Sequence, residues 1–157
     1  MPKKKRVITN VSEKEEIINN CDCCYVGMVD ENNNPYVVPF NFGYRENTIY
    51  LHSAPEGKKI SILKKSSQVC IAFSTAHKLN FQSENMACSY SMFYKSVLCY
   101  GNIEFIENYE LKVEAMNIIM KQYTGKEFGF SVPSINGVLV YKVVIDEMTG
   151  KEFGNLY

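Results

Sequence analysis

Short runs of alternating apolar and polar residues, joined by turn-forming residues, dominate the first third of the chain. Residues 24–29 (CYVGMV) and 35–44 (PYVVPFNFGY) flank the polar turn DENNN, and residues 48–53 follow a second turn at 45–47. A period of two places successive side chains on opposite faces of a β-strand. Consecutive strands joined by such short turns predict an antiparallel meander.

The remainder of the chain extends this pattern with further strand-like stretches. We expect a strand at 68–74 and a last strand at 138–146 before a short polar end. The apolar region 86–106 is expected to form either two strands or one strand strongly bent by a bulge. The polar residues 75–85, which include His77, are expected to form a surface loop. Repeated short strands with little edge protection favour a mainly β fold, an antiparallel β-barrel, closed or split, with inserted helices.

Capping signals place helices between these strands. Ser12 and Glu15 have the spacing of a capping box that starts a short helix. Asn108 is expected to cap a longer helix that Gly125 ends, because asparagine favours the N-cap and glycine favours the left-handed position after the last turn. The barrel is therefore expected to carry at least these two helices.

The length and charge of the chain limit its organisation and its partners. We expect residues 1–10 to form a flexible basic tail and residues 11–157 to form a single domain. The 17 basic and 17 acidic side chains cancel, which argues against general nucleic-acid binding. No apolar run reaches the roughly 18 residues that cross a membrane, and no secretory signal opens the chain. The sequence therefore predicts a cytoplasmic protein that binds neither nucleic acid nor membrane.

Six cysteines raise the question of a metal site. Three of them lie in the motif CDCC, but the adjacent Cys23 and Cys24 would point to opposite faces of a strand. No pair of CxxC motifs and no neighbouring histidine completes a tetrahedral set. We expect reduced, mostly buried thiols and no metal, as is usual in a reducing compartment.

The stretch IYLHSAPEGKKISIL, residues 49–63, changes from a strand pattern to a helix pattern. Pro55 suits the first position of the helix, because its fixed φ is helical and its missing N–H costs nothing there. Ser53 is expected to act near the cap. The junction is therefore predicted to be a helix N-terminus.

Two features of this predicted N-terminus do not favour helix stability. Gly57 would lie in the first turn at a cost of about 1 kcal/mol relative to alanine. Lys58 and Lys59 would place positive charge at the positive end of the helix dipole. A bound phosphate explains both, since free amides approach an anion closely and a lysine neutralises it. Alternatively, Glu56 complements the dipole, Gly57 is a tolerated defect and the lysines are simply solvated.

The stretch 35–44 presents two different faces. Its aromatic and aliphatic even-numbered residues are expected to face the core: Tyr36, Val38, Phe40 and Phe42. The opposite face carries Val37, Pro39 and Asn41. Pro39 cannot donate to a strand ladder, so it marks an edge or an irregular point. Backbone groups near Pro39 are then free to meet a ligand, although a structural irregularity alone explains the proline equally well.

The region 86–106 also alternates. One face carries Tyr94, Ser96, Leu98 and Tyr100, and the other carries Phe93, Lys95, Val97 and Cys99. A hydroxyl and a cation between aromatic rings suit a planar ligand, whose faces need π-contacts and hydrogen-bond donors. The alternative is that these residues form a half-buried barrel wall.

Four segments together resemble a known family. In chain order they are PYVVPFNF, IYLHSAPEGKKISIL, CSYSMFYKSVLCYGNIEFIE and VYKVVIDEMTGK. They are similar to the flavin-binding split-barrel proteins related to pyridoxamine 5′-phosphate oxidase, and more narrowly to the branch that includes nitroimidazole-resistance proteins. The resemblance runs from about Ile8 to Lys151 and keeps the order and spacing of the motifs.

The resemblance implies a homodimer with FMN held at the subunit interface. It assigns the FMN phosphate and its surroundings to His52, Ser53, Lys58 and Lys59. It places the isoalloxazine ring beside Pro39, Phe40 and Asn41, with a contribution from Tyr94, Ser96 and Val97. His52 is the residue expected to meet the substrate, and the alternative is a histidine satisfied by backbone groups at a strand end.

Two departures narrow what the resemblance implies. Lys95 stands where many relatives carry arginine, so a bidentate contact to a phosphate or carboxylate is lost. The chain has no tryptophan and ends in MTGKEFGNLY, without the arginine- and tryptophan-bearing C-terminal segment of the vitamin B6 oxidases. Vitamin B6 oxidation is therefore not expected.

Three functional hypotheses follow from the resemblance. The first is an FMN-dependent oxidoreductase that passes electrons, with NAD(P)H as a possible donor, to a small planar substrate such as a nitroimidazole. The second is a non-enzymatic flavin-binding protein for storage or sensing, because the chain has only two histidines and no evident nucleophile–base pair. The third is a related barrel that holds haem or a deazaflavin.

Overall fold

The computed structural model describes residues 3–155. The strands in this range are β1 (Lys3–Ile8), β2 (Cys24–Val29), β3 (Pro35–Phe40), β4 (Gly43–Arg45), β5 (Thr48–Ser53), β6 (Gln68–Asn80), β7 (Ser91–Ile106) and β8 (Leu139–Asn155). The helices are α1 (Val11–Asn19), α2 (Lys58–Lys65), the short 3₁₀ turn η1 (Ala87–Ser89), α3 (Tyr109–Thr124) and α4 (Val132–Asn136).

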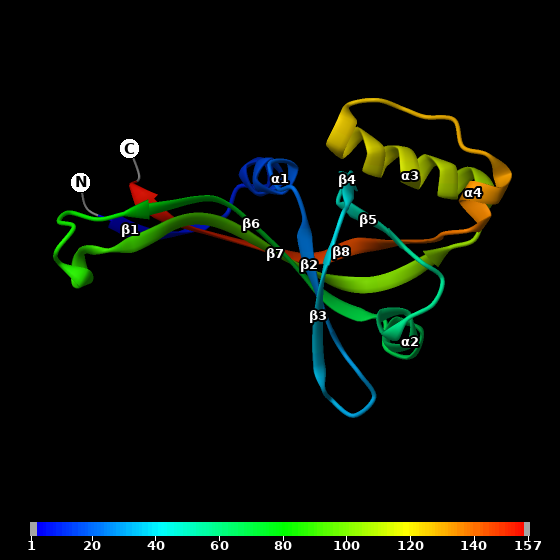
Figure 1. The fold of residues 1–157 in the computed structure, drawn as a ribbon, viewed down its shortest axis with the longest axis horizontal. Coiled ribbons are helices and arrows are strands. Elements are labelled where there is room, and N and C mark those ends of the chain that lie inside the picture. The colour runs from blue at the N-terminus through cyan, green and yellow to red at the C-terminus, as the bar shows by residue number, and fades with distance from the viewer. Residues whose placement is uncertain (1–2, 156–157) are drawn as a thin grey trace.

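The strands form one antiparallel sheet that curls without closing. Its order is β3-β2-β6-β7-β8-β5-β4, and β1 pairs with β8 beside this path. Helices α3 and α4 lie at one end, α2 lies on the other side of the long strands from α3, and α1 lies over the middle of these strands (Figure 1). The sheet and its inserted helices confirm the predicted mainly β, antiparallel split barrel.

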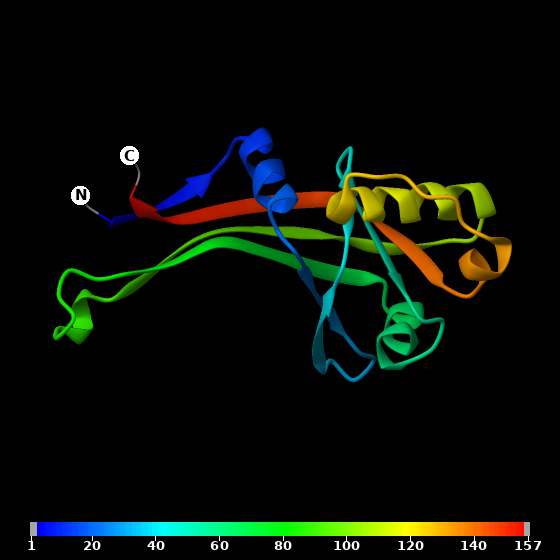
Figure 2. The ribbon, with the colours of Figure 1, turned by 45° about the horizontal axis from the view of Figure 1, so that its top comes forward.

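The long strands reach well beyond the barrel. An extended arm projects away from the helices α3 and α4 in both views (Figures 1 and 2). It consists of β1 and the distal parts of β6, β7 and β8. Both described ends of the chain lie in this arm, because β1 pairs with the last residues of β8, from Lys3 opposite Asn155 to Ile8 opposite Gly150.

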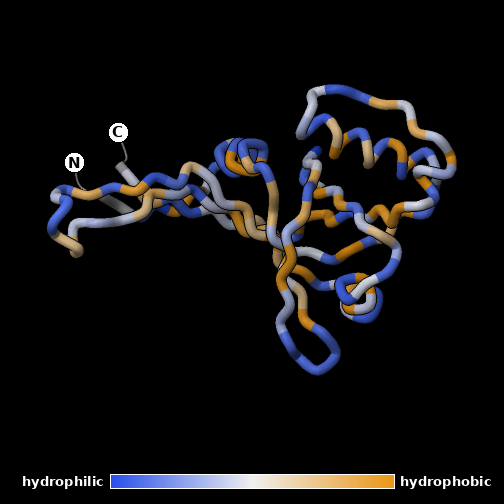
Figure 3. Tube along the Cα trace, in the orientation of Figure 1, coloured by the Kyte–Doolittle hydropathy of each residue, from blue (hydrophilic) through white to orange (hydrophobic). Residues whose placement is uncertain are grey.

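The main core fills the barrel with the inward-facing residues of these strands. Phe42 and Phe73 pack edge to face with ring centroids 4.9 Å apart, and both are fully buried. A smaller cluster lies between α3, α4 and β8 and includes Ala115, Ile135 and Val140. The turn between β2 and β3 is hydrophilic, whereas the strands that it joins are largely apolar (Figure 3). The predicted alternation in β3 is confirmed, since inward Phe40 is 5% exposed and outward Val37 is 61% exposed.

The predicted edge position of Pro39 is also confirmed. Strand β3 lies at one end of the sheet and pairs only with β2. The missing N–H of Pro39 therefore breaks no ladder on the outer side. Asn108 caps α3 as predicted, because its side chain accepts a hydrogen bond from the Leu111 N–H, and Gly125 ends the helix with φ of 70°.

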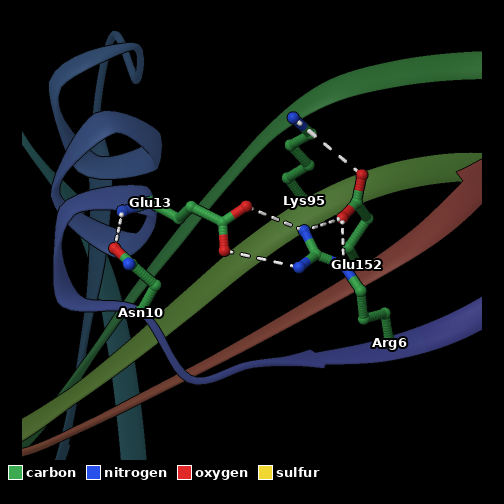
Figure 4. A network of polar contacts seen from close by, with 5 residues as sticks. All are labelled: Arg6, Asn10, Glu13, Lys95 and Glu152. Carbon is green, nitrogen blue, oxygen red and sulfur yellow. Dashed lines mark hydrogen bonds and ion pairs between the residues drawn. The ribbon is translucent and has the colours of Figure 1, made fainter. Parts of the chain in front are cut away.

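The described part of the basic N-terminal segment differs from the prediction of a flexible tail over residues 1–10, of which residues 1–2 lie outside the described residues. Residues 3–8 form β1, and Arg6 donates hydrogen bonds to Glu152 at 2.6 Å and to Glu13 at 3.0 Å (Figure 4). Lys95 lies 3.9 Å from Glu152 in the same network. The acidic partners come from α1 and β8, so the order of this segment depends on long-range pairing that its composition does not reveal.

The start of α1 and the end of β6 also differ from prediction. Helix α1 begins at Val11, and its N-cap is Asn10, which accepts from the Glu13 N–H at 3.1 Å, rather than Ser12. Strand β6 continues past the predicted end at residue 74, through an irregularity between Thr75 and Lys78, because β7 pairs with it as far as Asn80. His77 is therefore part of a strand and not of a loop.

The C-terminal half contains one expected feature and one further difference. After the η1 turn, region 86–106 forms a single strand, β7, and its register with β8 shifts between Tyr100 and Gly101. This agrees with the expectation of one strand that contains a bulge. Strand β8 extends from the predicted stretch 138–146 to Asn155, so the expected polar end is paired with β1. Helix α4 lies in the segment between α3 and β8. Among residues 3–155 no helix is long and apolar enough to span a bilayer.

Replacement of Gly43 by alanine is expected to destabilise the fold. An ideal Cβ on Gly43 would lie 2.7 Å from the backbone of Ile118 and Ile119 in α3, which cannot move as a side chain can. Such overpacking costs about 1–3 kcal/mol, or a fall in Tm of roughly 2–12 °C. Thermal unfolding measures this loss. Gly129→Ala is the matched control, since a Cβ there meets no atom within 4 Å, and an equal loss in both variants would contradict the packing argument.

Candidate functional site

The corner between β5 and α2 is a helix start without a side-chain cap. Helix α2 begins at Lys58, and Gly57 is its N-cap with φ of 130°, so Pro55 lies before the helix and not at its first position. The first helical hydrogen bond runs from the Ser61 N–H to the Gly57 carbonyl at 3.0 Å. The N–H groups at the start of a helix have no partner within it and point outward. An ideal Cβ on Gly57 meets no atom within 4 Å, so the corner is open.

Two lysines are the first two residues of α2. The Nζ of Lys58 lies 4.7 Å from the centroid of the Tyr36 ring, and the Nζ of Lys59 lies 4.8 Å from the centroid of the Phe40 ring. Cation–π contacts of this length hold the ammonium groups near the barrel. No acidic residue occupies the first turn of α2. The positive end of the helix dipole therefore carries two added charges, an arrangement that favours an anion.

His52 lies beside this corner, as the second-last residue of β5. It is half-buried, and both its burial and the nearby charge of Lys59 lower the pKa of its imidazole. The ring is consequently neutral at pH 7, with one nitrogen that donates a hydrogen bond and one that accepts.

Ser53 has a different environment from the one expected. Its hydroxyl donates to the Ala54 carbonyl at 3.0 Å and accepts from the Tyr141 hydroxyl at 3.1 Å. Ser53 is only 8% exposed, and it does not cap α2. Its one hydroxyl hydrogen is thus used within the protein, which leaves the lysines and backbone amides as the donors at the corner.

The residues expected beside a flavin ring are divided between two faces of the barrel. Phe40 points inward and lies against the buried ring of Tyr141, with centroids 6.1 Å apart. Pro39 and Asn41 are exposed on the outer side of the edge strand. On β7, Val97 is fully buried in the core, whereas Tyr94 and Ser96 alternate with it and point outward.

The predicted site residues on β7 do not meet His52 within one chain. Along β8, His52 is opposite Val140, whereas Val97 is opposite Gly150. These two β8 positions are ten residues apart, a separation of up to about 33 Å along a strand. One copy of the chain therefore brings together His52, Phe40 and the lysines of the corner, but not the β7 group.

The outward side chains of β3, β2, β6 and β7 form a partly apolar surface, which we call the outer face. Pro39, Tyr25, Ala72 and Leu98 lie opposite one another across these four strands. The exposed fractions are 49% for Tyr25, 36% for Leu98 and 38% for Tyr100. Ser96 lies next along β7 on the same face. Sequence alternation identified the β7 part of this face, but the pairing with Tyr25 depends on the sheet order.

Other parts of the described chain offer less for binding. A cavity of about 480 Å³ beside α3 is lined by Arg45, Glu114, Lys121 and Glu127 among others, but these charges pair with each other. The six cysteines are free, and no group of metal-binding side chains occurs among residues 3–155. The sequence does not identify Tyr141 as a residue of the site. The alternating pattern of the last strand marks this residue only as inward-facing.

The fold and this corner define an antiparallel split-barrel protein with an anion-suited strand-to-helix turn. The sequence model of the pyridoxamine 5′-phosphate oxidase family matches residues 10–152. The chain therefore belongs to the pyridoxamine 5′-phosphate oxidase family, as its sequence resemblance indicated. No curated protein matches the sequence.

Solved structures share the fold at different degrees of sequence identity. A candidate 5-nitroimidazole antibiotic resistance protein from Bacteroides thetaiotaomicron is 49% identical, with a TM-score of 0.87 over 98% of this chain and 90% of that chain. The FAD and heme binding protein of Mycobacterium smegmatis has a TM-score of 0.81 at 14% identity, over 93% of this chain and 72% of that chain. The flavocytochrome Anf3 of Azotobacter vinelandii has a TM-score of 0.77 at 19% identity, over 93% and 68%. The last two similarities concern the fold alone.

Proposed function

We propose that this protein binds FMN and acts as an oxidoreductase on small planar substrates such as nitroimidazoles. Family membership and the 49% identity to a candidate nitroimidazole resistance protein support this assignment. The observation that carries it is the open, uncapped start of α2, where Lys58 and Lys59 occupy the first turn together with amides that have no helical partner. This donor set fits a phosphate, because it combines free N–H groups, two cations and no carboxylate in the first turn.

The residues of the corner have separate tasks in this proposal. Lys58, Lys59 and the first amides of α2 hold the phosphate of FMN. His52, kept neutral by burial and by Lys59, contacts the flavin or the substrate with a ring nitrogen that donates or accepts. Bound FMN supplies the electron transfer, and the protein supplies binding and orientation.

We propose in addition that the protein is a homodimer with FMN at the interface. The distance along β8 between the corner and the β7 group supports this, since one copy does not assemble the full set that the resemblance implies. The outer face is the surface proposed for the contact. It carries Pro39, Asn41, Ser96 and the exposed aromatic and aliphatic side chains of neighbouring strands, and exposed apolar surfaces of this kind commonly mark protein interfaces. Tyr94 continues this face toward the arm.

The absorption spectrum of the purified protein, followed by titration with FMN, tests the proposal. The expected result is a flavin spectrum, bleaching by NADH or NADPH, and reoxidation by a nitroimidazole. A colourless protein that does not bind added FMN would refute the assignment, and a Soret band would identify haem instead.

A second candidate function is flavin binding without catalysis. It is favoured by the scarcity of catalytic groups, since His52 and His77 are the only histidines of the chain. Under this alternative the bound flavin is not reduced by NADH or NADPH. Reduction followed by reoxidation with substrate would exclude it.

A further inference from the structure

We infer that Tyr141 is the positioning residue of the phosphate-binding corner, acting through Ser53 and through Phe40. The inference rests on the proposed function and deepens it, because it identifies what holds the corner in shape. It also changes the role of Ser53 from a phosphate donor to a link between the barrel interior and the turn.

The first connection is a chain of hydrogen bonds. Tyr141 lies near the start of β8, opposite Leu51 of β5 and Phe105 of β7, and it is fully buried. Its hydroxyl donates to Ser53 Oγ at 3.1 Å, and Ser53 Oγ donates to the Ala54 carbonyl at 3.0 Å. Burial raises the pKa of Tyr141 to about 12, so the hydroxyl keeps its proton at neutral pH. The chain ends at Ala54, the residue at which the polypeptide leaves β5 for the corner.

The second connection is through the aromatic ring. Tyr141 packs edge to face against Phe40, with centroids 6.1 Å apart and an interplanar angle of 83°. Phe105 also contacts the Tyr141 ring, with centroids 5.5 Å apart. Phe40 in turn lies under the Nζ of Lys59 at 4.8 Å. One buried side chain thus supports both the turn that leads to the amides and the ring that orients a lysine.

The open turn makes these connections important for binding. No side chain caps α2, and Gly57 has a backbone conformation, φ of 130°, that other residues rarely adopt. The turn from Ala54 to Gly57 is therefore held at its strand end by the Ser53 hydroxyl, whose partner is Tyr141. Loss of the Tyr141 hydroxyl removes one fixed point of the turn but leaves the aromatic packing in place.

The affinities of Tyr141→Phe for FMN and for riboflavin test the inference. We expect the dissociation constant for FMN to rise about fivefold to tenfold, the effect of one lost hydrogen bond. The constant for riboflavin should stay within about twofold, because riboflavin has no phosphate for the corner to hold. A loss of general stability alone would weaken the two ligands equally.

Tyr44→Phe is the matched control. The Tyr44 hydroxyl donates to Glu15 at 2.8 Å between β4 and α1, away from the corner. This variant removes a similar hydroxyl and should bind both ligands as the wild type does. A fall in FMN affinity as large as that of Tyr141→Phe would overturn the inference.

Ser53→Ala provides a second, independent route to the result. If Ser53 and Tyr141 act as one chain, Ser53→Ala gives the same FMN-specific loss, and the double variant loses no more than either single variant. Additive losses, or equal losses for FMN and riboflavin, would contradict the inference. This variant also serves if Tyr141→Phe does not fold.

The outcomes separate this inference from the proposed function. A wild-type protein that binds FMN no better than riboflavin refutes the phosphate-binding corner itself. A wild type that prefers FMN, together with a Tyr141→Phe variant that keeps the full preference, refutes only the role of Tyr141.

Discussion

Replacement of both Lys58 and Lys59 by alanine is expected to weaken FMN binding by about 100-fold. Hydrogen bonds to charged groups contribute about 1.5–3 kcal/mol each, so two lost phosphate contacts at the lower end of this range correspond to roughly two powers of ten. The fold itself should not suffer, because cations at a helix N-terminus oppose the dipole. Isothermal titration or flavin-fluorescence quenching measures the affinity, and thermal unfolding of the ligand-free protein measures the stability.

The other end of the same helix provides the matched control for this experiment. Lys64→Ala with Lys65→Ala removes the same charge from α2, but at its last turn, where Lys65 pairs with Glu31 on the surface. We expect this pair to leave FMN affinity within about threefold of the wild type, since screened charges distant from the ligand contribute little. Equal losses in the two double variants would indicate a general charge effect and would remove the phosphate site from the proposal.

Leu98→Glu is expected to convert the proposed dimer into a monomer. Leu98 lies on the outer face, level with Ala72 and Tyr25 on the neighbouring strands. A carboxylate buried without a partner in an apolar contact costs several kcal/mol, which corresponds to a rise of about 100-fold or more in the dimer dissociation constant. The monomer should also lose bound flavin, because each proposed site takes residues from both copies. Light scattering coupled to size-exclusion chromatography, with the flavin absorbance recorded, measures both effects.

Leu111→Glu controls for the introduction of a charge. Leu111 is 53% exposed in the first turn of α3, away from the outer face, and a carboxylate there complements the helix dipole. This variant should remain dimeric and keep its flavin. A Leu98→Glu variant that stays a dimer with full flavin content would exclude the outer face as the interface.

Local signals predicted most of the elements correctly. Alternation identified β2, β3 and β5, and Asn108 and Gly125 marked the ends of α3, because these preferences depend on a few neighbouring residues. The errors occur where the secondary structure of a segment depends on pairing with a strand that is distant in the sequence. Residues 3–8 and 75–80 are polar enough to suggest a tail and a loop, yet both are strands because β8 and β7 provide partners for them.

In the candidate site, too, some features follow from the local sequence and others from long-range pairing. The glycine and lysines after β5 indicated an anion site from their types and positions alone, although the helix starts at Lys58 and not near Pro55. The contacts that shape the corner were not visible in the sequence. Tyr141 and Ser53 are 88 residues apart, and only the pairing of β5 with β8 brings their hydroxyls together.

The sequence by itself determined the class of fold, the family and the chemistry available at the turn after β5. These follow from periodicity, capping residues and residue types, which act over short distances along the chain. Only the tertiary structure decided that the Ser53 hydroxyl accepts a hydrogen bond from Tyr141. It also decided that the β7 residues lie far from His52 in one chain, and that the basic N-terminal segment is a strand. Those outcomes depend on which strands become neighbours, and that choice is made by the burial of the whole sheet and not by any single segment.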